Sequence, residues 1–215
     1  MATQLAVANM ALGRIGNFSI TDFDDENSPE AGHCRLHFDL VRKTLLRDFD
    51  WNFATTETTL AEGDAAEDTF GYTYNYELPD DYLQALEFND VPAGTTQTRW
   101  KIYGILLYSD VEPDDAVFRY VADVDDCEDW DDIFTTAFTW YLAAAIAPAI
   151  SNSPAMAGDL LKAGQAYLKD AKAGDVLETS LKVIRGQQHS RYQAAREGRT
   201  TRTGNWMTQD WGPPN

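Results

Sequence analysis

Residues 70–78 have the sequence FGYTYNYEL, in which aromatic side chains alternate with small or polar ones. Because successive side chains of a β-strand point to opposite faces, this alternation predicts a strand with one aromatic face. Residues 79–81, PDD, then end the strand. We expect the aromatic face, which holds Tyr72, Tyr74 and Tyr76, to pack in a core or an interface. A platform that stacks sugars or bases is the alternative.

More strands are predicted after this segment. Residues 83–88 indicate a short helical turn that runs into a strand. Residues 99–109 are typical of a hairpin that turns at Gly104, and residues 117–122 predict a further strand. We therefore expect a small antiparallel sheet of four or five strands, inserted at about residues 53–122.

Two helices are predicted before the strands. Residues 4–14 carry apolar side chains at helical spacing, and Gly16 follows as a stop signal. A second helix is expected to begin at Ser28 and Pro29, because serine is a good N-cap and proline suits the first helical turn. Its apolar stripe consists of Phe38, Val41, Leu45 and Phe49.

Two more helices are predicted after the strands. Helical periodicity returns at Asp129 and gives a wide apolar face as far as Pro148, which is expected to kink or end the helix. A last helix is expected to start at Ser153 and Pro154 and to stop at Gly174. Its predicted apolar stripe is Met156, Leu160, Ala163, Tyr167 and Ala171.

These patterns predict an α+β fold: a mainly α-helical bundle with an inserted small antiparallel β-sheet and an extended C-terminal tail. The body is expected to span residues 1–180 and the tail residues 181–215. The whole chain of 215 residues has 35 acidic and 17 basic residues, a net charge of -18. A surface of this kind repels nucleic acid and anionic lipid, and it suits a soluble protein, a cationic partner or a wall along which DNA must slide.

The charge is uneven along the chain. Residues 181–215 have a net charge of +4, whereas the first 180 residues have -22. The tail has too little apolar periodicity to fold alone, so we expect it to become ordered against a partner. A terminus without a role is the alternative. The predicted partner-binding residues are Arg185, Arg191, Tyr192, Arg196, Arg199, Arg202, Trp206 and Trp211.

Motifs for catalysis and cofactor binding are absent from the sequence. It has no P-loop, no GxGxxG after a strand, no GxSxG and no HExxH. We therefore predict a protein that is not an enzyme, with no catalytic residues and no cofactor. Two cysteines give no disulfide framework, and neither a secretory signal nor a membrane span is expected.

Metal binding is the weaker interpretation of two other patterns. His33 and His37 lie four residues apart on a predicted helix, with Cys34 between them, and could hold a metal. The acidic runs 22–27 and 123–129 lack the glycine that a calcium-binding EF-hand loop needs. Surface histidines, a solvated acidic face and favourable helix N-termini explain these residues better, so no metal site is predicted.

Four segments, in this order, resemble the tail tubular protein A family, the head-to-tail adaptors of short-tailed bacteriophages. They are ALGRIG at 11–16, VRKTLLRDFDWNFA at 41–54, YELPDDYL at 76–83 and the alanine- and aromatic-rich segment 130–150. The resemblance covers roughly residues 2–174. The two middle segments together are its most specific part, and the tail after Ser180 matches no family pattern.

The resemblance implies a structural role in the virion neck, assembled in the host cytoplasm. Adaptors of this family form a ring, expected here to have 12 copies, between the portal protein and a nozzle of tail tubular protein B-like subunits. Genomic DNA passes through the ring, and the C-terminal segments reach into the portal. The family has a helix bundle with a β insertion and brings no catalytic residues. Another neck or tail component, such as a stopper or nozzle subunit, and an acidic stand-alone binding protein that mimics nucleic acid remain as alternatives.

Overall fold

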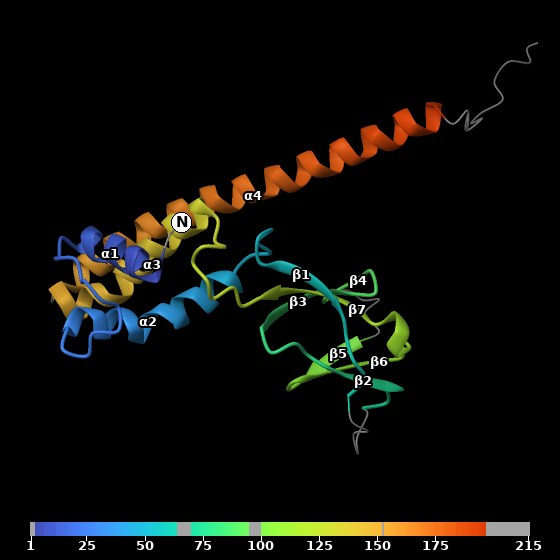
Figure 1. Cartoon of the computed structure of the whole chain (residues 1–215), viewed down its shortest axis with the longest axis horizontal. Coiled ribbons are helices and arrows are strands. Elements are labelled where there is room, and N and C mark those ends of the chain that lie inside the picture. The colour runs from blue at the N-terminus through green and yellow to red at the C-terminus, as the bar shows by residue number, and fades with distance from the viewer. Residues whose placement is uncertain (1–2, 64–69, 95–99, 152, 197–215) are drawn as a thin grey trace, which may run out of the picture. The chain divides into compact units, whose positions relative to one another are not determined.

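The computed structural model describes residues 3–63, 70–94, 100–151 and 153–196, with side chains as far as Leu177. Within these residues the fold is α+β, with four α-helices and two antiparallel sheets (Figure 1). The chain divides into a unit of residues 1–175 and a unit of residues 176–215. The elements in chain order are α1 (Gln4–Ile15), α2 (Pro29–Leu46), β1 (Thr55–Thr59), β2 (Tyr74–Glu77), β3 (Tyr82–Phe88), β4 (Val91–Pro92), β5 (Trp100–Tyr103), β6 (Leu106–Ser109), a 3-10 turn (Pro113–Asp115), β7 (Val117–Ala122), α3 (Asp132–Ser151) and α4 (Pro154–Arg196).

The first helix begins and ends where the sequence predicts, and the second begins there but ends at Leu46, so Phe49 of its predicted stripe lies beyond the helix. Gly16 adopts a left-handed conformation with φ of 78° and closes α1, as the stop signal requires. The Ser28 hydroxyl accepts a 3.2 Å hydrogen bond from the backbone N–H of Ala31, and Pro29 occupies the first turn of α2. These caps satisfy backbone groups that a helix end otherwise leaves without partners.

Helix α3 forms the centre of the helical core. It begins at Asp132 instead of Asp129, because the Asp131 carboxylate caps the first turn by accepting a 2.7 Å bond from the N–H of Ile133. Pro148 lies inside the helix, which continues for three more residues and ends at Ser151. By length and composition α3 could cross a membrane, but more than half of it is buried inside the protein, as in a core helix.

Helix α4 corrects two predictions. Gly164 brings α4 so close to α3 that a Cβ atom there would lie 3.0 Å from Tyr141, and this contact turns the buried face toward Leu160 and Leu168. Tyr167, expected in the buried stripe, is 44% exposed. The other buried positions of this face are Gly164 and Ala171.

The predicted helix end at Gly174 is wrong, because α4 continues to Arg196. Gly174 keeps a helical backbone, and the next residue, Asp175, is held by Asn52: the Asn52 backbone N–H donates to the Asp175 carboxylate at 3.2 Å. The extended conformation expected from residue 181 is therefore also wrong as far as Arg196. The rest of the predicted tail, residues 197–215, lies outside the described residues.

The β insertion contains two sheets instead of the single one predicted, with strand orders β1-β7-β3-β4 and β2-β6-β5. Residues 83–88, expected to begin as a helical turn, belong to strand β3, which pairs with β7. The hairpin around Gly104 is confirmed: β5 pairs with β6, and Gly104 has a positive φ of 63°. Arg99, expected at its start, lies outside the described residues.

The aromatic strand is shorter than its sequence pattern. Phe70 and Gly71 have positive φ, so the strand starts only at Tyr74. Tyr76 is fully buried, and its hydroxyl donates a hydrogen bond to the Val111 carbonyl. Tyr74 packs against the same cluster. Packing in a core is therefore the correct interpretation of these two tyrosines.

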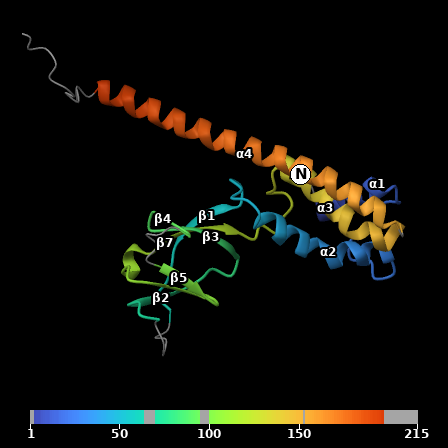
Figure 2. The same ribbon diagram turned by 180° about the vertical axis from the view of Figure 1, so that it is seen from behind.

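Two hydrophobic clusters hold the residue 1–175 unit together. Figures 1 and 2 show α1, α2 and α3 packed together in a bundle and the strands gathered past the C-terminal end of α2. The helical cluster centres on fully buried Phe134 and Phe138, and the β cluster on Phe88 and Phe118. Leu86 of β3 packs against the helical cluster, so this strand contributes to both. Fully burying one such aromatic side chain contributes about 1.5–3 kcal/mol.

Candidate interaction surfaces

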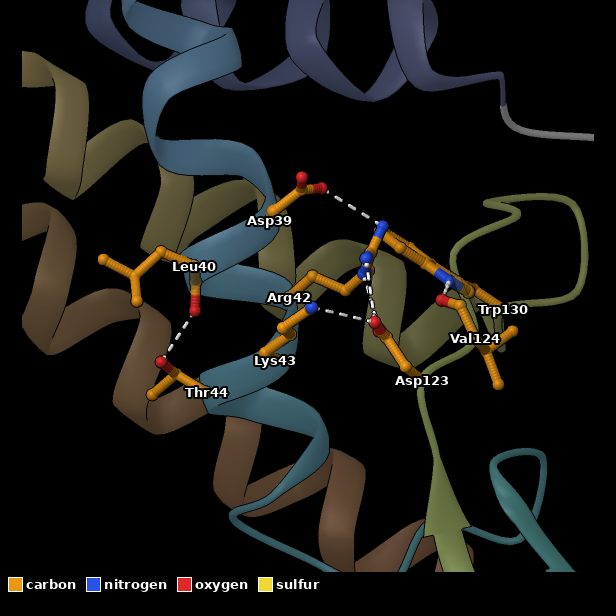
Figure 3. Close-up of polar contacts among 8 residues, drawn as sticks. All are labelled: Asp39, Leu40, Arg42, Lys43, Thr44, Asp123, Val124 and Trp130. Atoms are coloured by element: carbon orange, nitrogen blue, oxygen red, sulfur yellow. Dashed lines mark hydrogen bonds and ion pairs between the residues drawn. The ribbon is translucent and has the colours of Figure 1, made fainter. Parts of the chain in front are cut away.

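A buried ion pair joins the helices to the β insertion (Figure 3). The Arg42 side chain on α2 is 8% exposed, and its guanidinium contacts both oxygens of Asp123, at 3.0 Å and 3.2 Å. Lys43 approaches the same carboxylate at 3.3 Å, and Asp39 accepts a contact from Arg42 at 3.2 Å. Because Asp123 directly follows β7, this pair fixes the place where the chain returns from the strands to the helices.

The chain between β7 and α3 is held by a tryptophan. The Trp130 indole N–H donates a 2.9 Å hydrogen bond to the Val124 carbonyl, which Figure 3 also shows. Its ring packs 4.8 Å from the Phe138 ring and 6.1 Å from the Phe38 ring, measured between centroids. The connection is therefore anchored at Asp123 and at Trp130.

Between these anchors and at the start of α3 lies a run of carboxylates, called here the acidic segment. All of its six acidic residues are exposed, and none forms an ion pair within the described part of the chain. Cys127 is buried among them, and burial, followed by the charge of Asp126, raises the pKa of its thiol to about 11. The acidic residues are Asp125, Asp126, Glu128, Asp129, Asp131 and Asp132.

A second surface is the outer face of α2, called here the α2 ridge. Leu36 and Leu40 lie one turn apart on it and are 71% and 66% exposed. Arg47 adds one positive charge, and the Thr44 hydroxyl donates to the Leu40 carbonyl at 2.7 Å. The ridge consists of His33, Leu36, His37, Leu40, Thr44 and Arg47.

Hollows flank the α2 ridge at both ends. One of about 340 Å³ lies beside His33, where the end of α1, the start of α2 and the end of α3 meet. The other, of about 490 Å³, lies beside Thr44 and Arg47 and is lined by Asp48 and Tyr141. A partner protein can cover this row of exposed leucines and place side chains in the two hollows beside it.

The possible metal ligands on α2 do not converge. Cys34 is fully buried, and burial raises the pKa of its thiol to about 11, so the thiol stays protonated at neutral pH. His33 and His37 lie on the partly exposed side of the helix instead. Among the residues that the structure describes, no three His, Cys, Asp or Glu side chains are grouped to hold a metal ion.

The predicted partner-binding residues are only partly placed. Four of them lie on the helical backbone of α4, in the stretch whose side chains the structure does not describe: Arg185, Arg191, Tyr192 and Arg196. The other four lie outside the described residues: Arg199, Arg202, Trp206 and Trp211. Partner binding by this set therefore stays a prediction. The sequence analysis missed the α2 ridge, although Leu36 and Leu40 lie off the buried stripe of their helix and were a usable signal.

Comparison with known proteins adds no assignment to these surfaces. No family model matches the chain, and no curated protein matches it.

Proposed function

We propose that this chain is the head-to-tail adaptor of a short-tailed bacteriophage. In this role it is a structural protein, and about 12 copies form a ring between the portal and the tail nozzle. Genomic DNA passes through the ring without sequence-specific binding. No catalytic residue, cofactor or membrane is part of the proposal. Support comes from the ordered sequence segments that resemble this family and from the fold in which they lie.

The observation that carries the proposal is the position of the β insertion. Strands β1 to β7 occupy the chain between α2 and α3, so a helix bundle is interrupted by a strand region, as the resemblance implies. Two of the segments that carry the resemblance meet this boundary: 41–54 contains Arg42, and 130–150 begins at Trp130. Arg42 and Trp130 are the anchors of the connection back from the strands. The resemblance therefore falls on residues that build the fold.

The surface charge suits a channel for DNA. The acidic segment alone exposes six carboxylates, and the chain as a whole has a net charge of -18. Because DNA carries a dense negative charge, carboxylates along a ring lumen repel the phosphate backbone and prevent sticking. Copies that repel one another must then associate through apolar contacts and a few opposite charges.

The C-terminal residues are the proposed portal contact. Residues 181–215 have a net charge of +4 and contain two tryptophans, which are frequent binding anchors. The helical backbone reaches Arg196, so Arg185, Arg191 and Arg196 are presented on a helix. Because most of the stability of a protein helix comes from packing against other surfaces, a partner surface that this part of α4 can pack against would stabilise it.

Electron microscopy of the full chain mixed with the portal protein encoded by the same genome tests the proposal. The expected image is a ring with a central channel on one end of the portal. A truncated chain of residues 1–180 should stay folded by circular dichroism but bind the portal at least tenfold more weakly. A second variant keeps the full chain and changes Arg185, Arg191 and Arg196 to Gln. This variant should lose the salt-dependent part of portal binding. Absence of portal binding by the full chain would overturn the proposal.

The acidic segment also favours a second candidate, a stand-alone protein that mimics nucleic acid. Six exposed carboxylates over eight residues resemble the charge density of a phosphate backbone. Such a protein would bind a basic DNA-processing protein as a monomer or dimer. Light scattering of the chain with and without the portal separates the two candidates, because only the adaptor assembles into a large ring.

A further inference from the structure

We propose that the α2 ridge of one copy docks on the acidic segment of the next copy. This inference rests on the proposed function, since it names the contact that would close the ring. It assigns a role to two surfaces that the fold itself does not use. The partner is a second copy of this chain.

The α2 ridge has the composition of an interface core. Leu36 and Leu40 are 71% and 66% exposed, although the opposite side of α2 is fully packed around Phe38 and Leu45. Isolated exposed leucines are ordinary, but two leucines one turn apart between two hollows form a continuous apolar row. Covering this row with a partner surface removes apolar area from water, which is favourable.

The charge of the ridge makes it complementary to the rest of the chain. Arg47 is exposed at the C-terminal end of the ridge, whereas the neighbouring Lys43 points away from it and contacts Asp123 of the same chain at 3.3 Å. Two of the acidic residues near the ridge are already paired with cations of the same chain. Asp39 contacts Arg42 at 3.2 Å, and Asp48 contacts Lys172 at 2.6 Å. The ridge therefore places one cation, Arg47, beside the apolar row of a strongly anionic protein, and this end of the ridge attracts acidic surfaces.

The acidic segment matches this patch in both properties. Asp126 and Asp131 use their carboxylates to hold the local backbone, accepting bonds from Glu128 N–H at 2.9 Å and Ile133 N–H at 2.7 Å. The other four carboxylates have no ion pair within the described residues and can meet Arg47. Ile133, directly after the segment, is 46% exposed and offers an apolar contact for the leucines.

The two surfaces of one copy face different ways. In Figure 3, Leu40 and Thr44 point to one side of α2, whereas Asp123, Val124 and Trp130 lie on the other side. The Arg42–Asp123 pair and the Trp130–Val124 bond fix the acidic segment on that other side. The ridge therefore meets an acidic segment only in another copy. A contact between two different patches is heterologous, and repetition of such a contact builds a ring.

Cross-linking between two chains that each carry one added cysteine tests the pairing directly. One chain carries Leu40→Cys and the other Asp129→Cys, and a short bismaleimide is added to each alone and to their mixture. The natural Cys34 and Cys127 are buried, so they do not react in the folded protein. The mixture should yield at least fivefold more cross-linked dimer than either chain alone. Leu161→Cys, on an exposed part of α4, is the control. Equal cross-linking of the Leu40→Cys chain with itself would overturn the proposal.

Charge changes give an independent measurement of assembly. The ridge variant is Leu40→Glu/Arg47→Glu and the segment variant is Asp125→Lys/Asp129→Lys. Each should weaken self-association by at least tenfold in sedimentation velocity, and their equimolar mixture should form dimers but nothing larger. The matched controls, Leu161→Glu/Lys169→Glu and Asp80→Lys/Asp114→Lys, make the same charge changes on other exposed residues and should associate like the unchanged chain.

The outcomes separate this contact from the proposed function. If both variants still form full rings on the portal, the ridge contact is wrong while the adaptor role stands. If the Leu40→Cys and Asp129→Cys chains cross-link as expected but the unchanged chain never binds the portal, the contact stands and the adaptor role is wrong.

Discussion

The guanidinium carbon of Arg14 lies 4.0 Å from the centroid of the Trp140 ring, and the same ring stacks on Tyr167 at 5.6 Å. These residues come from α1, α3 and α4, so one tryptophan connects three helices. Arg14 also donates a 2.9 Å hydrogen bond from Nε to the Thr139 hydroxyl. The contact explains how a charged side chain can be accommodated between helices: its charge faces an aromatic ring and its Nε–H has an acceptor.

Replacing Arg14 by Met should lower the free energy of unfolding by about 1–3 kcal/mol, because a cation–π contact and a hydrogen bond are lost. Urea unfolding measures this loss. Trp140→Leu alone and together with Arg14→Met completes a double-mutant cycle. The effects of the two single changes should not add, because each removes the same contact. Additive effects would contradict a direct interaction between the two side chains.

Replacing Arg42 by Met should cost about 3–5 kcal/mol, because Asp123 would remain half-buried without its main partner. The double variant Arg42→Met/Asp123→Leu should recover at least half of this loss, since an apolar pair needs no compensating charge. Urea unfolding gives the stability, and proteolysis between residues 123 and 131 reports whether the connection has loosened. A double variant as unstable as Arg42→Met alone would show that the cost comes from packing instead.

The sequence predicted most helix starts because caps act locally. Ser28 and Ser153 bind backbone N–H groups three residues ahead, and their neighbours decide whether they can do so. It failed at Gly174 because a glycine ends a helix only where the surroundings allow a left-handed turn. Here Asn52, which is distant in the sequence, donates hydrogen bonds to the carboxylate and the carbonyl of Asp175, and the helix continues past Gly174.

The sheets were hard to predict because strand pairing, like the contact of Asn52 with Asp175, joins residues that are distant in the sequence. Strand β1 has the sequence TTETT, which contains no apolar residue, and its hydrogen bonds come from β7, more than 50 residues away. The α2 ridge was missed although the predicted buried stripe of its helix already left Leu36 and Leu40 on another face. Long-range pairing and burial are thus what local patterns lack.

Raising the pH above 10 should destabilise the fold through Tyr120. Burial raises the pKa of Tyr120 to about 12, and donation of its hydroxyl to the Asp81 carboxylate, at 2.9 Å, adds to the shift. The unfolded chain loses this proton from its ordinary value of 10, while the folded chain keeps it. The stabilising contribution is therefore complete below pH 10 and is lost as the pH rises toward 12.

Urea unfolding at pH 8, 9, 10 and 11 measures this effect. Tyr120→Phe should lower stability at pH 8 by about 1 kcal/mol, the value of one hydrogen bond, and should make the decline above pH 10 shallower. Burial also raises the pKa of Tyr76 to about 12, so part of the decline should remain in this variant. An unchanged slope would mean that Tyr120 ionises equally in both states.

Two glycines of α4 should respond to alanine in opposite directions. A Cβ atom at Gly164 would lie 3.0 Å from the Tyr141 ring and 3.1 Å from Trp140 Cβ, closer than ordinary contacts allow. Gly164→Ala should therefore push α4 away from α3 and cost about 1–3 kcal/mol. Gly158 has no atom within 4 Å of such a Cβ, so Gly158→Ala should stabilise the helix by about 0.5–1 kcal/mol. Thermal unfolding of both variants measures the difference. If Gly164→Ala were as stable as the unchanged chain, α4 would not pack on α3 through this residue, and the buried face of the helix would have to be assigned again.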